Sequence, residues 1–179
     1  MTSVAPATGL IAELLEYPAA GYQQRLAEVM ETLPRTDERV ANLLGKFATA
    51  VSARSLQQME ELYVQTFDLN PDACLEIGWH LFGEDYARGE FLVKLRQEMR
   101  RHKVPDRDEL PDSLLSVLPL LARMPEEEAA HFRARFLLPA LEKLRRAVPE
   151  SNPFADLLSA LILLLAGDGT ECGPAKGDS

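Results

Sequence analysis

The sequence predicts an all-α protein, a single-domain bundle of about eight to nine helices. Apolar residues recur at helical spacing through most of the 179 residues, and proline or glycine interrupts this spacing at intervals. No window alternates apolar and polar residues for long enough to predict a strand. We expect the helical domain to span residues 1–166 and the polar, glycine-rich tail of residues 167–179 to be disordered.

The first third of the chain contains clear helix signals. A first helix around Leu10–Leu15 is expected to end at Tyr17-Pro18, because the residue before a proline disfavours helical geometry. Residues 40–51 carry the clearest apolar stripe, and Ser55 with Gln58 forms a capping box that opens the next helix.

The chain is organised around residues 63–89. Asn70 before Pro71 is typical of a helix N-cap followed by proline at the first helical position, and the helix so begun carries Trp79 and His80. Gly83 is expected to end that helix in a left-handed conformation.

The next helix is expected to hold Glu84 and Asp85 in its first turn, where the helix dipole favours acids. Glu84 then lies four residues before Arg88, the spacing of a helical ion pair. Gly89 is expected to allow another helix to approach closely. Glycine inside a helix lowers its stability relative to alanine, and close packing would explain why glycine is present.

Prolines and one long loop divide the second half. Residues 103–109 form the longest loop between helices, a position that often carries function. Pro119 is expected to kink one helix and Pro139 to break or bend another. Residues 154–165 are apolar on nearly all sides, which predicts a helix in the middle of the bundle, starting at Asn152-Pro153.

Composition narrows the classes of protein. Nineteen basic residues against 28 acidic ones give a net charge of −9, which argues against nucleic-acid binding and fits attraction of a basic ligand. The N-terminus lacks the pattern of a signal peptide, and the longest apolar run is too short for a membrane-spanning helix, so we expect a cytoplasmic protein with no direct membrane insertion. Cys74 and Cys172 do not form a disulfide framework.

Catalytic and metal sites are not expected. His80, Glu84 and Asp85 fit an acid/base cluster by type, but no nucleophile or phosphate-binding loop accompanies them, so a hydrogen-bonded histidine beside capping acids is the favoured interpretation. Cys74 and His80 are not spaced as a helical ligand pair, and His102 and His131 have no acidic or cysteine partner at ligand spacing. We therefore predict no catalytic residue, no metal and no cofactor.

Two features remain open at this level. Arg96, Arg100, Arg101 and Lys103 cluster at a helix C-terminus, where cations complement the dipole, and a solvated helix end is the favoured interpretation. Trp79 and Phe82 either line a groove or belong to the core.

The order and spacing of several short motifs resemble the NarJ-type delta proteins, assembly chaperones of respiratory nitrate reductases and related molybdoenzymes within the TorD/DmsD-like group. The resemblance covers about residues 14–165. The motifs are Tyr63…Thr66-Phe67-Asp68, residues 80–85 (HLFGED), Arg88-Gly89 and Leu110-Pro111-Asp112. The chain departs from the pattern at Ser113-Leu114, where a histidine-leucine pair is common, so the client is either nitrate reductase or a related molybdoenzyme.

The resemblance implies a TorD/NarJ-like fold and a non-catalytic, cytoplasmic chaperone that acts as a monomer or weak dimer. Its partner would be the catalytic (alpha) subunit of a molybdoenzyme, bound through an N-terminal peptide so that the molybdenum cofactor can be inserted before assembly. Nine residues are expected to contact this client: Tyr63, Phe67, His80, Phe82, Glu84, Asp85, Arg88, Pro111 and Asp112. The alternative is a permanent helical subunit of a membrane-associated oxidoreductase complex.

Overall fold

The computed structural model describes residues 4–33 and 37–167, and the regular secondary structure of this part of the chain is helical, without a strand. The helices are α1 (Val4–Leu14), α2 (Tyr22–Thr32), α3 (Glu38–Ser52), α4 (Leu56–Tyr63), α5 (Ile77–Phe82), α6 (Tyr86–Arg101), α7 (Leu114–Leu121), α8 (Glu126–Phe132), α9 (Leu138–Ala147) and α10 (Pro153–Gly167). Among them α8 and α9 join through a π-helical turn into one rod. The predicted all-α class is confirmed.

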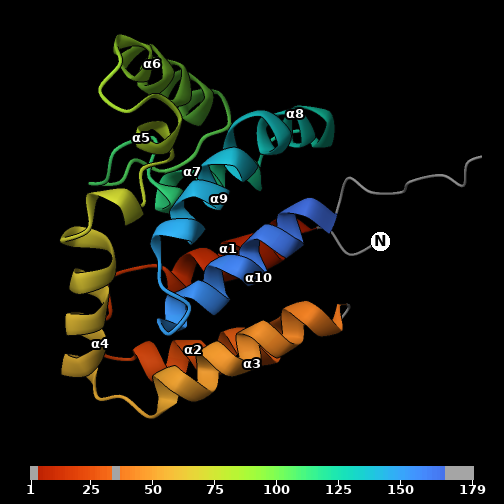
Figure 1. Ribbon diagram of the computed structural model, residues 1–179. Helices are drawn as coiled ribbons and strands as arrows, with labels where there is room; N and C mark the ends of the chain where they lie inside the picture. Colours follow the sequence, from red (N-terminus) through yellow and green to blue (C-terminus); the bar gives the residue numbers. More distant parts are fainter. Residues whose placement is uncertain (1–3, 34–36, 168–179) are drawn as a thin grey trace, which may run out of the picture.

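Helix α10 lies in the middle of the molecule, as its apolar sequence predicts. It packs most extensively against α3 and also contacts α1 and α9. Figure 1 shows α2 and α3 at one end, α5 and α6 at the other, and α1 and α10 between them. The helices at both ends of the molecule therefore bury their apolar sides toward its middle, where α10 lies.

An aromatic cluster fills the junction of α3, α4 and α10. The Phe154 ring lies 4.9 Å from the Phe67 ring, 5.7 Å from the Phe47 ring and 6.0 Å from the Tyr63 ring, measured between centroids. These separations are typical of favourable aromatic pairs in a core. Two of the expected client-contact residues, Tyr63 and Phe67, are thus part of the central packing.

Local signals explain most helix ends. Ser55 and Gln58 form the predicted capping box at the start of α4. Asn152 caps α10, since its Oδ1 accepts a hydrogen bond from the Phe154 N–H. Pro119 lies inside α7 as predicted.

One predicted helix boundary is wrong. Asn70 caps only a short 3₁₀ turn, Pro71–Ala73, and α5 begins separately at Ile77. At Pro139 the chain stays helical without a break, and a π-helical turn, Arg133–Leu137, interrupts the regular α-helix just before the proline. The expectation that residues 168–179 are disordered lies outside the described residues.

No helix in the described ranges has the length and apolar character needed to cross a membrane.

Candidate functional site

The α5–α6 corner is held to the start of α7 by two backbone hydrogen bonds. The Ile77 N–H donates to the Asp112 carbonyl (2.8 Å), and the Leu114 N–H donates to the Leu75 carbonyl (2.9 Å). They form an isolated antiparallel bridge between Glu76 and Ser113. This bridge brings two of the motifs recognised in the sequence, residues 80–85 and 110–112, to one place in the fold.

Arg88 and Asp112 form an ion pair beneath this corner. Arg88 Nε donates to Asp112 Oδ2 at 3.0 Å, and the Asp112 side chain is fully buried, at 0% exposure. The Arg88 guanidinium also lies over the Trp79 ring, 5.8 Å from its centroid. The predicted pairing of Arg88 with Glu84 is therefore wrong, because a buried carboxylate needs a cation more than an exposed one does.

The second Asp112 oxygen, Oδ1, is buried and has no hydrogen-bond partner among the described residues. Such an atom is uncommon in a folded protein. The Asp112 side chain is therefore paired through one oxygen only, Oδ2, and its partner is Arg88.

Gly78 allows Asp112 to occupy its position. A Cβ atom on Gly78 would lie 2.4 Å from Asp112 Oδ2, a separation that forces movement. By contrast, a Cβ atom on Gly89 would meet nothing within 4 Å, so no described helix approaches Gly89 closely. The close packing that was expected at Gly89 is thus found at Gly78, against the Asp112 side chain. The sequence contains only one indication of it, a glycine within a short apolar helix.

His80 lies in the same corner and is hydrogen-bonded. Its Nε2 lies 2.7 Å from the Cys74 carbonyl oxygen, which assigns the ring proton to Nε2, and Lys143 donates to the His80 carbonyl at 2.8 Å. Burial lowers the pKa of His80 below its usual value, so the ring is neutral near pH 7. Burial also raises the pKa of the Cys74 thiol to about 11, which keeps this cysteine protonated and unreactive.

Glu84 and Asp85 are exposed on the surface of the corner. Asp85 is the N-cap of α6, where its Oδ1 accepts from the Ala87 N–H at 2.8 Å. Glu84 precedes the helix, which corrects the expectation that both acids lie in its first turn. Gly83 ends α5 as predicted and has a positive φ of 57°, but its ψ of −130° is not that of the expected left-handed conformation.

The nine expected contact residues therefore fall into three groups. Tyr63 and Phe67 belong to the aromatic core; Pro111 and Asp112 are buried beneath the corner; and only the remaining five lie partly or fully at its surface: His80, Phe82, Glu84, Asp85 and Arg88. Trp79 and Phe82, left open by the sequence, are both partly exposed, and the Phe82 ring packs 5.3 Å from the Phe91 ring.

One exposed face of α6 was missed by the sequence reasoning. Tyr86 and Val93 lie seven residues apart, on the same side of the helix, and are 87% and 56% exposed. Gly89 and Glu90 lie between them and are exposed too. The face is apolar at its ends and open at Gly89; acids precede it at Glu84 and Asp85, and Lys94 follows it. Its signal in the sequence was the i, i+7 spacing of Tyr86 and Val93.

A cavity of about 270 Å³ lies behind the loop of residues 103–109. Arg96 and Arg100 of α6 line it together with Pro111, and neither arginine forms an ion pair within the described ranges. Asp106 and Glu109 contribute opposite charge to the same wall. The long loop therefore encloses space of mixed charge beside the Leu110-Pro111-Asp112 motif.

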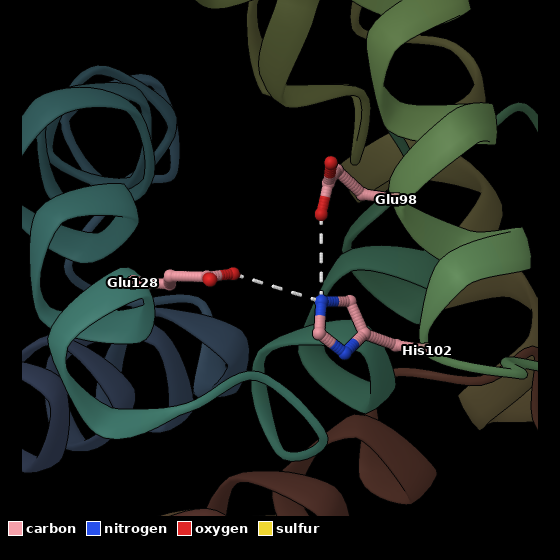
Figure 2. A group of neighbouring side chains, drawn as sticks. All are labelled: Glu98, His102 and Glu128. Carbon is pink, nitrogen blue, oxygen red and sulfur yellow. Dashed lines mark ion pairs between the residues drawn. The ribbon is translucent and has the colours of Figure 1, made fainter.

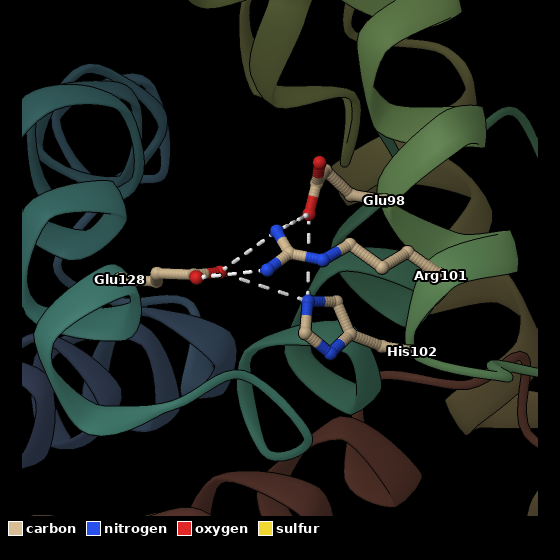
Figure 3. A network of polar contacts seen from close by, with 4 residues as sticks. All are labelled: Glu98, Arg101, His102 and Glu128. Atoms are coloured by element: carbon tan, nitrogen blue, oxygen red, sulfur yellow. Dashed lines mark hydrogen bonds and ion pairs between the residues drawn. The ribbon is translucent and has the colours of Figure 1, made fainter.

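Glu98, His102 and Glu128 are the group in the described residues with the geometry of a possible metal site (Figure 2). His102 ends α6, four residues after Glu98, and Glu128 lies in the first turn of α8. The expectation that His102 has no acidic partner is wrong: Glu98 was available in the sequence at i, i+4, and Glu128 is supplied only by the fold. Arg101 contacts the same two carboxylates (Figure 3), so the predicted solvated helix end is an ion-pair network at this position.

Comparison with known proteins places this all-helical domain in a defined class. The family model described as "Nitrate reductase delta subunit" matches residues 33–156, which include the whole α5–α6 corner. The chain belongs to the nitrate reductase delta subunit family.

Two curated relatives resemble the chain over most of its length. It is 29% identical over 164 residues to the "Nitrate reductase molybdenum cofactor assembly chaperone NarJ" of Escherichia coli (strain K12), covering 88% of this chain and 68% of NarJ. It is 27% identical over 149 residues to the "Nitrate reductase-like protein NarX" of Mycobacterium tuberculosis (strain ATCC 25618 / H37Rv), covering 83% of this chain but only 22% of NarX. The expected family is confirmed.

Proposed function

We propose that this protein is a non-catalytic, cytoplasmic chaperone that binds the catalytic subunit of a respiratory molybdoenzyme, nitrate reductase or a relative. Binding would occur through an N-terminal peptide of that subunit and would keep it competent for insertion of the molybdenum cofactor. Membership of the nitrate reductase delta subunit family supports this proposal, as does similarity to a relative named for cofactor assembly.

The observation that carries the proposal is the exposed face of α6 defined by Tyr86, Gly89, Glu90 and Val93. An amphipathic helix places apolar side chains at i, i+3, i+4 and i+7, which this face can receive. Gly89 leaves open space between the two apolar residues, so a client helix can approach the α6 backbone there.

The charge of the corner favours a basic peptide. Glu84 and Asp85 are exposed at the start of α6, and Glu90 lies on the proposed contact face. The chain as a whole carries a net charge of −9. Opposite charges attract such a peptide over a distance and increase its rate of association.

In this proposal the buried residues of the motifs do not contact the client; they hold the contact residues in place. The Arg88–Asp112 pair and the bridge at Glu76 and Ser113 fix the α5–α6 corner on α7. Tyr63 and Phe67 anchor α4 and the turn after it to α10. We assign direct client contact to Phe82, Glu84, Asp85, Tyr86 and Val93.

The test is calorimetric titration of the protein with a synthetic peptide of the client's N-terminal 15–30 residues, a length of about four to eight helical turns. We expect saturable binding that weakens as salt is raised, because exposed charges are screened. The double variant Tyr86→Ala/Val93→Ala should bind about tenfold or more weakly, since it removes apolar area from the contact. Leu69→Ala, which removes an apolar side chain that is also exposed but lies outside α6, is the matched control and should bind like the wild type.

Two results would contradict the proposal. Equal affinity of the Tyr86→Ala/Val93→Ala variant and the wild type would exclude this face of α6. Absence of peptide binding, together with stable co-purification of an entire partner subunit, would favour the permanent-subunit alternative.

A further inference from the structure

Three potential metal ligands converge between the end of α6 and the start of α8. His102 Nε2 lies 3.4 Å from Glu98 Oε2 and 3.7 Å from Glu128 Oε2. All three ligand atoms lie within 4.8 Å of one another. Two ligands of a tetrahedral zinc ion are about 3.4 Å apart when each bond is about 2.1 Å, so the observed spacing fits one cation.

His102 Nε2 is a buried polar atom without a hydrogen bond. The His102 side chain is 11% exposed, and no described residue forms a hydrogen bond with Nε2. The two carboxylates are within ion-pair distance of it, but the arrangement does not meet hydrogen-bond geometry. An unsatisfied buried atom that faces two carboxylates needs an explanation, and a shared cation supplies one.

Arg101 now holds the carboxylates that a cation would need. Its Nη1 atom lies 3.3 Å from Glu98 Oε2 and 3.3 Å from Glu128 Oε2, the two oxygens that face His102 (Figure 3). Its Nη2 atom donates to Glu128 Oε1 at 3.1 Å. The Arg101 side chain is 57% exposed, so it can leave these oxygens for solvent without loss of a buried contact.

We propose that Glu98, His102 and Glu128 bind a divalent transition-metal ion, with Zn²⁺ the best match, and that Arg101 competes with this ion for the two carboxylates. An imidazole nitrogen with two carboxylate oxygens suits zinc, whereas Mg²⁺ and Ca²⁺ prefer oxygen ligands throughout. The site opens on a surface depression that Glu127 and His131 also line, so a fourth ligand has room to enter.

The bound ion would join α6 to α8. Glu98 and His102 belong to α6 and its C-cap, and Glu128 belongs to α8. Binding of one ion to both helices favours the folded state by mass action. This inference is independent of the proposed client binding, because it concerns the opposite end of α6.

The test is titration of the full chain with ZnCl₂ alone, followed by calorimetry and by thermal unfolding. We expect one zinc ion per chain and a higher Tm with zinc. Arg101→Gln should bind zinc about tenfold more tightly, because it removes both a competing donor and a repelling charge. His102→Gln and Glu128→Gln should each weaken binding about a hundredfold or more, since each leaves only two protein ligands.

Matched controls separate this site from general effects of charge. Arg146→Gln removes an exposed arginine that, like Arg101, pairs with a glutamate of its own helix, here Glu142 of α9, and should leave zinc affinity unchanged. Circular dichroism of each variant establishes that it is folded, and Glu128→Gln tests the site from a second helix if His102→Gln fails to fold. The proposal is overturned if both ligand variants bind zinc as the wild type does, or if Arg101→Gln does not tighten binding.

Discussion

At the scale of single residues, the corner depends on one buried carboxylate. The Asp112 side chain has no exposed surface, and Arg88 pairs with only one of its two carboxylate oxygens. Removing one partner of such a pair costs far more than the pair itself contributes, because a charge then remains buried alone. Arg88 and Asp112 therefore depend on each other, and Gly78 provides the space they need.

Gly78→Ala should destabilise the protein by about 2 kcal/mol, since its methyl group would displace the Asp112 carboxylate from Arg88. Gly89→Ala, the control in a neighbouring helix, should raise stability by about 1 kcal/mol, because it improves helix propensity and meets no atom. Urea unfolding of both variants measures the two effects. Equal stability changes in the two variants would show that Asp112 readily moves away from Gly78.

Sequence reasoning reached only part of this site, and the residues show why. It placed Asp112 and Arg88 among the functional residues but paired Arg88 with Glu84, its neighbour on the expected helix. The true partner is 24 residues away, and nothing in the local pattern distinguishes a buried carboxylate from an exposed one.

Among the helices, α6 has a different role at its start, along its exposed face and at its end. Its start is capped by Asp85, its exposed face presents Tyr86 and Val93, and its end supplies Glu98, Arg101 and His102. Its other side packs through Phe91 and Leu95. A single amphipathic helix thus links the proposed client face to the proposed zinc site.

Asp85→Ala should destabilise the protein by about 1 kcal/mol through loss of the N-cap, and Asp85→Asn should not, because asparagine caps equally well. These two variants distinguish the capping role of Asp85 from the effect of its negative charge. If that charge attracts a basic client, Asp85→Asn should weaken peptide binding at low salt while the free energy of unfolding stays the same. Thermal unfolding and calorimetry at two salt concentrations measure both effects. Full peptide affinity in Asp85→Asn would restrict Asp85 to its structural role.

At the scale of the whole molecule, α10 unites the two ends of the fold. It packs on α3 at one end and on α1 and α9 toward the other, with Phe154 at the centre of the aromatic cluster. The α5–α6 corner, where we propose that the client binds, therefore lies apart from the aromatic cluster at the centre of the core.

Phe154→Ala should reduce the free energy of unfolding by about 3–5 kcal/mol, since it opens a cavity between the three rings that surround Phe154. Tyr86→Ala removes an aromatic ring that is 87% exposed and should change stability by less than about 0.5 kcal/mol. Denaturant unfolding of the two variants provides the comparison. A small effect of Phe154→Ala would mean that the surrounding helices collapse into the space.

Patterns in the sequence were enough to predict the all-α class, the central position of residues 154–165, the capping box at Ser55 and the end of α5 at Gly83. These features depend on periodicity and capping, which act over three or four residues and can be recognised without a partner. Three other features became visible only in the packed fold: Arg88 pairs with Asp112, Gly78 and not Gly89 is closely packed, and Glu128 faces His102. Each of these depends on which distant segment lies nearby, and burial, which sets the energetic need for a partner, exists only once the helices have packed.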